Sequence, residues 1–161
     1  MATTDFYLKI DGIDGESQDD NHTGEIDLES WSWGCTQSGA SASGGGGGKG
    51  KVSMQDFKFV MKVNKATPKL IEACASGKVF GSAILTCRKA GGEQEGYLSY
   101  KFTDVLISSY QTGGSGANII PTEQISFNYA KMEVEYKEQK SSGSMGGAIK
   151  GGWDLKKNKT V

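Results

Sequence analysis

The stretch ATPKLIEACASG, residues 66–77, decides the fold, because it is the one segment with a helical pattern in a chain of strand and turn patterns. Thr67 is a residue type favoured as a helix N-cap. Pro68 suits the first helical position, since its missing N–H has no partner to lose there. Gly77 suits a left-handed C-terminal stop. These signals predict a single short helix over residues 67–76.

The predicted helix carries an apolar stripe with i to i+4 spacing, made of Leu70, Ile71, Cys74 and Ala75. A helix of this length is marginal alone in water, so the stripe needs a surface to cover. The flanking segments DFKFVMKV, residues 56–63, and VFGSAILTC, residues 79–87, have strand patterns. We therefore expect the helix to lie on a sheet.

Five segments alternate apolar with other residues, which predicts strands with one face against a core. The core-facing positions are Phe6, Leu8 and Ile10; Trp31, Trp33 and Cys35; Phe57, Phe59, Met61 and Val63; Leu98, Tyr100 and Phe102; Ile125, Phe127 and Tyr129. In the second segment Ser30, Ser32 and Gly34 take the opposite side. The residues alone thus predict a mainly β domain with one helix.

Changes of parity refine the predicted strands. The core-facing parity switches at Gln55–Asp56, which indicates a bulge or a strand that crosses between sheets. It switches again at Ala130–Lys131, which indicates a second bulge. Residues 123–139 are predicted to form the longest strand. The Gly91-Gly92 pair predicts a hairpin turn.

Three further segments have turn or loop composition. Residues 11–25 are predicted to be a polar loop, and residues 141–152 a Ser/Gly connector. After the connector, Trp153 and Leu155 are expected to dock on the body, with a solvated Lys-rich tip beyond them. Residues 36–50, TQSGASASGGGGGKG, cannot bury enough apolar surface to order themselves. We predict a flexible loop there, inside a single domain spanning residues 1–161.

Composition excludes several classes of function. Eighteen basic and 19 acidic residues give a formal net charge of -1, so no long-range field favours nucleic acid or an anionic membrane. The N-terminus has no signal-peptide pattern, and no segment approaches the roughly 20 apolar residues of a membrane span. Cys35, Cys74 and Cys87 are widely separated, which indicates reduced buried thiols and folding in a reducing cytosol.

The candidate chemical motifs each have a simpler explanation. The run GGGGKGK, residues 45–51, resembles a phosphate loop, but Val52 stands where a Ser or Thr must reach magnesium. An acidic cluster in the 11–25 loop lacks the order of a calcium loop, and we interpret it as solvated turn residues. His22, the only histidine, is interpreted as exposed and non-catalytic. We therefore predict no catalytic residues, no metal site and no cofactor.

Several segments, taken in order, resemble the Hcp family, the haemolysin-coregulated tube subunits of bacterial type VI secretion. They are DFYLKIDGIDGES, EIDLESWSWGCTQSG with its Gly-rich loop, TPKLIEACASGK, RKAGGE, TGGSG and GWDLKKN. The resemblance covers essentially the whole chain. It implies a barrel-like body of two packed, mostly antiparallel sheets with one helix, and no C-terminal effector domain. It also implies hexameric rings that stack into a hollow tube.

The same resemblance implies partners and a location. The partners are further copies of the chain, a VgrG-type spike, contractile sheath proteins and small effectors carried in the lumen, with no nucleic acid and no membrane insertion. The chain folds in the bacterial cytoplasm and is exported by type VI secretion without a signal peptide. The leading hypothesis is a structural export tube that is not an enzyme. The alternative is a monomeric binding module that stacks sugars on Trp31 and Trp33.

Candidate interaction sites follow from position and mobility. Ser32 and Ser30, opposite the tryptophans, are candidate lumen residues, although solvent-facing or close-packed positions explain them equally well. The candidates for ring stacking or subunit contact are Ser41, Ser43, Gly46, Lys49, Ala90, Gly91, Gly92, Lys156 and Lys157.

Overall fold

The computed structural model describes residues 4–38, 51–89, 96–117, 119–139 and 145–161. The helix is α1 (Thr67–Ser76). The strands are β1 (Thr4–Ile10), β2 (Ile26–Leu28), β3 (Ser30–Ser32), β4 (Cys35–Gln37), β5 (Val52–Met54), β6 (Phe57–Lys62), β7 (Val79–Lys89), β8 (Gly96–Gly113), β9 (Thr122–Asn128), β10 (Lys131–Gln139), β11 (Met145–Asp154) and β12 (Lys159–Thr160).

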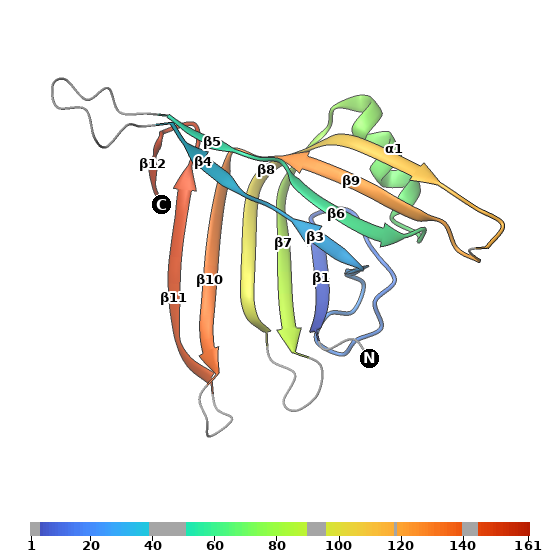
Figure 1. The fold of residues 1–161 in the computed structure, drawn as a ribbon, viewed down its shortest axis with the longest axis horizontal. Coiled ribbons are helices and arrows are strands. Elements are labelled where there is room, and N and C mark those ends of the chain that lie inside the picture. Colours follow the sequence, from blue (N-terminus) through green and yellow to red (C-terminus); the bar gives the residue numbers. More distant parts are fainter. Residues whose placement is uncertain (1–3, 39–50, 90–95, 118, 140–144) are drawn as a thin grey trace, which may run out of the picture.

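The strand β8 organises the main sheet, because its two halves pair with different neighbours. Its first half lies between β7 and β10, whereas its second half pairs with β9. One path of antiparallel strands therefore runs β12-β11-β10-β8-β7-β1-β2, and a second runs β8-β9-β6-β3. The two paths form two layers with the core between them (Figure 1). The predicted mainly β architecture of two antiparallel layers with one helix is confirmed.

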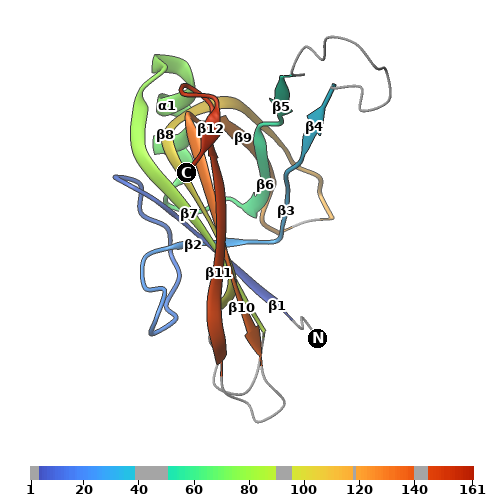
Figure 2. The same ribbon diagram turned by 90° about the vertical axis from the view of Figure 1, so that its left-hand side faces the viewer.

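The body resembles a barrel, but its hydrogen-bonded ladder does not close. β2 pairs with β1, and β3, which follows after Glu29, pairs with β6 in the other layer. The Glu29 N–H donates to the Val60 carbonyl at 2.8 Å, so the chain itself crosses from one layer to the other there. The curved layers and this crossing are visible side-on in Figure 2.

The core between the layers is aromatic and aliphatic. Its largest fully buried side chains include Phe57, Phe59, Phe102 and Phe127, whose rings pack with centroids 5.0–6.3 Å apart. Aromatic residues carry large apolar areas and pack edge-to-face or offset, so few of them fill much of the interior. The predicted inward parity is confirmed for these strands.

The helix has the predicted bounds, but its N-cap and its buried face differ from the prediction. Gly77 takes the left-handed conformation with φ 69°, as expected. The N-cap is Ala66, and the Thr67 hydroxyl instead donates to the Glu123 carboxylate at 2.5 Å. Of the predicted stripe, Leu70 is buried and Cys74 is half-buried against the core, whereas Ile71 and Ala75 are exposed. The second fully buried helix residue is Ala73.

The predicted crossing at Gln55–Asp56 is confirmed, since β5 belongs to a separate two-stranded sheet with β4 and β6 belongs to the main sheet. The β4–β5 sheet projects from the body (Figure 2). Residues 36 and 37 belong to β4, so the predicted flexible loop is wrong for these two positions; residues 39–50 of that prediction lie outside the described residues. At Ala130 there is a break between β9 and β10 where a bulge was predicted.

Four other predictions are wrong. The longest strand of the described chain is the 18-residue β8, not residues 123–139. The Ser/Gly connector is largely the strand β11, in which Gly152 is required because a Cβ there would lie 2.6 Å from the Met132 carbonyl oxygen. Val63 lies past the end of β6 and is exposed. Cys35 is exposed, whereas Cys87 is buried and Cys74 half-buried; all three are free.

Candidate functional site

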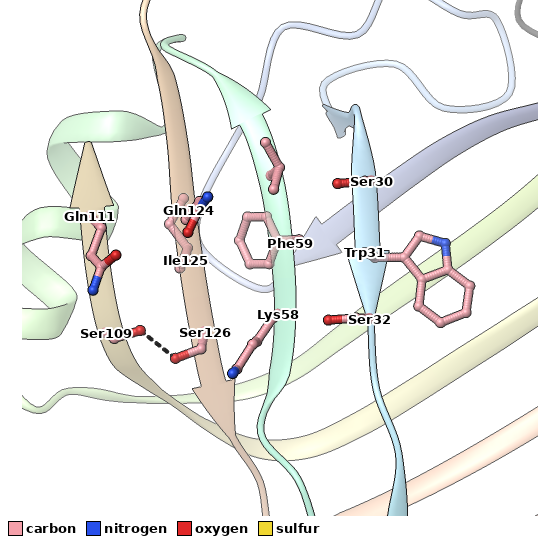
Figure 3. A pocket seen from close by; sticks show the side chains of 11 residues that line it. Ser30, Trp31, Ser32, Lys58, Phe59, Ser109, Gln111, Gln124, Ile125 and Ser126 are labelled. Atoms are coloured by element: carbon pink, nitrogen blue, oxygen red, sulfur yellow. Dashed lines mark hydrogen bonds between the residues drawn. The ribbon is translucent and has the colours of Figure 1, made fainter. Parts of the chain in front are cut away.

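An exposed hollow lies on the outer side of the β3–β6–β9–β8 layer, with a volume of about 310 Å³. The outward-facing residues that line it on these four strands are Ser30, Ser32, Lys58, Val60, Ser109, Gln111, Gln124 and Ser126. We call this set the polar face. Figure 3 shows Ser30 and Ser32 on the hollow side of β3 and Trp31 on the opposite side.

The polar face is the reverse side of the aromatic core. Along a strand successive side chains point to opposite faces, so burial of Phe57 and Phe59 on β6 turns Lys58 and Val60 outward. On β9, burial of Ile125 and Phe127 turns Gln124 and Ser126 to the other side in the same way. The core pattern therefore fixes which residues form the face.

Strand register arranges the face in two rows. One row is Ser32–Lys58–Ser126–Ser109, and the other is Ser30–Val60–Gln124–Gln111. Directly opposed residues on neighbouring strands are close enough for their side chains to interact. Each row thus presents short or uncharged side chains across four strands, with one ammonium group in the first row.

A β-bulge concentrates hydroxyl groups at the β8 end of the first row. The register between β8 and β9 shifts between Ile107 and Ser109, so both Ser108 and Ser109 reach the Ser126 hydroxyl, at 2.9 and 2.5 Å. The Ser108 hydroxyl also donates to Asp56 Oδ2 at 2.6 Å. This hydrogen-bonded chain satisfies Ser126, which is nearly buried, and occupies the Asp56 carboxylate.

The tryptophans behind the polar face pack inward. Trp31 stacks on Phe57 with centroids 5.9 Å apart and also contacts Phe6 and Tyr100. The Trp33 Nε1–H donates to the Tyr129 hydroxyl, which in turn donates to the Gln55 carbonyl at 2.9 Å. Burial raises the pKa of Tyr129 to about 12, with a lesser opposing effect of the Trp33 donor. This packing favours a structural role for both tryptophans over a sugar-stacking platform.

On the opposite layer, the 11–25 loop covers the outer side of β1 and β7. Arg88 on β7, 3% exposed, donates to both oxygens of Asp19 in the loop, at 2.9 and 2.5 Å, and to the Tyr7 hydroxyl at 2.9 Å. Its guanidinium also lies over the Tyr7 ring, and Asp5 is 3.4 Å away. We call this set the covered face. The Arg88 hydrogen bond holds the pKa of the Asp19 carboxyl below its usual value.

The prediction of an exposed His22 is wrong. Its ring stacks on Tyr7 with centroids 4.4 Å apart, and Nδ1 lies 2.8 Å from Glu25 Oε2. The side chain is 14% exposed. His22 therefore helps to hold the 11–25 loop on the body. Asp19, one of the acidic residues interpreted as solvated, is likewise half-buried on Arg88.

Four of the predicted contact residues lie in the described part of the chain, and seven lie outside it. Ser30 and Ser32 are brought together on the polar face, and Lys156 and Lys157 are exposed near the C-terminus, where Lys156 lies 3.5 Å from Asp104. The others lie outside the described residues: Ser41, Ser43, Gly46, Lys49, Ala90, Gly91 and Gly92.

Within the described part of the chain, no group of three or more His, Cys, Asp or Glu side chains is placed to hold a metal ion. In the same residues, no helix is long and apolar enough to cross a membrane. Burial raises the pKa of the Cys87 thiol to about 11, so this cysteine is unsuited to act as a nucleophile at neutral pH.

Sequence reasoning found two of the eight residues of the polar face. The missed residues are Lys58, Val60, Ser109, Gln111, Gln124 and Ser126. A usable signal was present for β6 and β9, since these positions have the parity opposite to the buried aromatics. For Ser109 and Gln111 the bulge in β8 disturbs that parity, and the pairing of β8 with β9 is needed to place them.

Comparisons with known proteins agree on one family. The family described as "Type VI secretion system effector, Hcp" matches residues 7–136. "Protein hcp1" of Pseudomonas aeruginosa is 48% identical over 156 residues, which is 96% of each chain. A crystal structure of Hcp1 from Salmonella typhimurium is 36% identical with a TM-score of 0.81, covering 99% of this chain and 100% of that chain. A structure titled "Structure of a type six secretion system protein" is 35% identical with a TM-score of 0.92 and the same coverage.

Proposed function

The chain belongs to the Hcp family of type VI secretion proteins, and from that premise we propose that it is a non-enzymatic structural subunit that assembles into hexameric rings. The rings stack into a hollow tube that carries small effectors. The observation that carries this proposal is the polar face, a four-strand surface of mostly small, uncharged groups that no described segment covers. In the proposed ring this face lines the lumen.

Ring closure needs a contact between unlike surfaces of neighbouring copies, related by a rotation that closes. One candidate surface is the core-side face of β10 and β11 beyond the body. There the row Leu98–Tyr136–Ile149 runs outward, and Tyr136 and Ile149 are 43% and 68% exposed. A neighbouring copy that covered these side chains would remove apolar surface from water. The edges of β2 and β3 that are unpaired in the described chain offer a second surface for strand pairing.

Stacking of rings needs a surface other than the one that closes each ring. Rings that add head to tail form an open filament, so this second contact repeats along the tube axis. The β4–β5 sheet projects from the body (Figure 2), and residues 39–50 follow β4 and precede β5 in the sequence. We assign stacking to this projection, together with residues 90–92 and the exposed Lys156 and Lys157. Deletion of residues 41–48 is expected to impair stacking more than ring closure, as measured by electron microscopy of rings and tubes. Normal tubes without these residues would overturn this assignment.

Cargo carriage is tested at the polar face. Ser32→Gln adds a longer side chain to the first row, beside Lys58, and fills part of the hollow. The expected result is loss of effector retention in a pull-down, with the hexamer mass unchanged. Glu72→Gln, on the exposed side of α1, is the matched control and is expected to retain cargo. Retention of cargo by the Ser32→Gln ring at the level of the control would contradict a lumen position for Ser32.

The remaining partners follow from this role. A stacked tube would be driven outward by a contractile sheath, carry a VgrG-type spike at its tip, and leave the bacterial cytoplasm by type VI secretion. None of these steps requires a reactive group in this chain, which agrees with the packing roles of His22, Cys87 and the tryptophans.

A further inference from the structure

Lys58 differs from every other residue of the polar face, because it is the one charged side chain in the two rows. It stands in the first row between Ser32 and Ser126 (Figure 3). Its backbone position is fixed by the pairing of β6 with β3 on one side and β9 on the other. The Lys58 side chain therefore extends from a fixed backbone position in the middle of the first row.

The carboxylates near this face have other partners. Asp56, two residues before Lys58, accepts a hydrogen bond from Ser108 at 2.6 Å. Glu29, at the turn before β3, lies 3.9 Å from the ammonium of Lys62. Among the described residues no carboxylate lies within ion-pair distance of Lys58. Within the described chain, Lys58 therefore has no direct ion-pair partner, and the anionic Asp56 is oriented toward Ser108.

The other residues of the polar face are neutral, and most of them can donate a hydrogen bond to an anion. Gln124 and Gln111 in the second row carry amide N–H donors, and Ser30 and Ser32 carry hydroxyls. A carboxylate placed on this surface would meet an ammonium and several neutral donors. An ammonium or guanidinium group would meet a like charge that has no ion-pair partner among the described residues.

We propose that Lys58 makes the polar face select polypeptide cargo with acidic rather than basic surfaces. This inference rests on the proposed function, since a closed ring repeats Lys58 on every subunit around one lumen. Repetition of a weak contact raises the overall affinity without any new type of contact. Cargo in the lumen also displaces water, and charges interact more strongly when water is excluded.

The experiment compares assembled rings of the wild type with Lys58→Glu and Lys58→Gln. Lys69→Glu is the matched control, because it makes the same change in net charge on exposed α1, away from the hollow. The probes are three unstructured polypeptides that differ only in having Glu, Gln or Lys at the same positions. Native mass spectrometry first establishes that each variant forms a ring, and the affinity of each probe is then measured at low and at physiological salt.

The wild-type ring is expected to bind the Glu probe about tenfold more tightly than the Lys probe, with a smaller difference at higher salt. Lys58→Gln is expected to abolish this preference, Lys58→Glu to reverse it, and Lys69→Glu to leave it unchanged. Rings that bind all probes equally, or none, would overturn this inference alone. An equal effect of Lys69→Glu would also overturn it, by assigning the preference to net charge. Absence of rings would overturn the proposed function, and the inference with it.

Discussion

The covered face and the polar face are both outer sides of the same strand system, yet the chain treats them differently. On the covered face the 11–25 loop lies over β1 and β7, and the long side chain of Arg88 is buried and paired with Asp19 and Tyr7. On the polar face no described segment of the chain lies over the hollow, and the side chains are mostly short, neutral and exposed. A polar group that is covered needs partners, whereas an open one has water. The covered face therefore stabilises the fold, whereas the polar face is available to contact molecules outside the subunit.

The largest expected effect is on the covered face, from Arg88→Met. Removing the guanidinium leaves Asp19 and Asp5, which both lie beside Arg88 Nη2, without their shared cation. We expect a loss of about 2 kcal/mol in the free energy of unfolding, less than for a fully buried pair because both carboxylates retain some contact with water.

The measurement is urea unfolding at one fixed protein concentration, since self-association also changes apparent stability. Lys58→Met, which removes a cation from the polar face, is the matched variant, and its expected change is below about 0.5 kcal/mol. Equal losses in the two variants would remove the distinction between the faces.

The second-largest expected effect is a loss of unfolding free energy in acid, caused by protonation of Asp19 on the covered face. The pKa of Asp19 is lower in the folded state than in the unfolded chain, chiefly through the Arg88 hydrogen bond, so the native state favours the ionised carboxylate. This stability is present above the unfolded pKa of about 3.9 and is lost as pH falls through the lower folded value. Stability should therefore decline below about pH 4.

Urea unfolding across this pH range provides the measurement. Asp19→Asn is expected to flatten the decline, and the flattening should disappear in an Arg88→Met background because the two residues act as one pair. An unchanged slope in Asp19→Asn would show that the acid response arises elsewhere, for example at Asp154, whose pKa is also lowered, first by a hydrogen bond from the Lys157 backbone.

The smallest expected effect concerns two serines of the polar face. Ser126→Ala removes a nearly buried hydroxyl that is hydrogen-bonded to Ser108 and Ser109, at a cost of about 1 kcal/mol. Ser30→Ala removes an exposed hydroxyl and is expected to change stability by less than about 0.5 kcal/mol. Thermal unfolding of both variants tests this order. A larger loss for Ser30→Ala would mean that the open rows also hold the fold together.

Local signals explain what the sequence predicted well. Pro68 and Gly77 act through their own backbone preferences, so the helix bounds were predictable from neighbouring residues alone. The alternation around Trp31 identified Ser30 and Ser32 for the same reason, since side-chain parity is a property of one strand.

The errors concern features that depend on residues distant in the sequence. Arg88 contacts Asp5 and Asp19 only after β1, β7 and the 11–25 loop have assembled. Because no local pattern reveals these contacts, the acidic residues were predicted to be solvated and His22 to be exposed. The glycines of β11 concealed a strand because Gly152 is set by the close approach of Met132 on β10. The β8 bulge that brings Ser109 to the polar face leaves no local pattern.

Native mass spectrometry of the purified chain, with electron microscopy of the same sample, tests the central claim most directly. If the polar face lines a lumen, the assembled particle should have six times the mass of one subunit and appear as a ring in electron micrographs. A chain that stays monomeric at high concentration, with no annular particles, would contradict the claim, because the polar face would then enclose nothing.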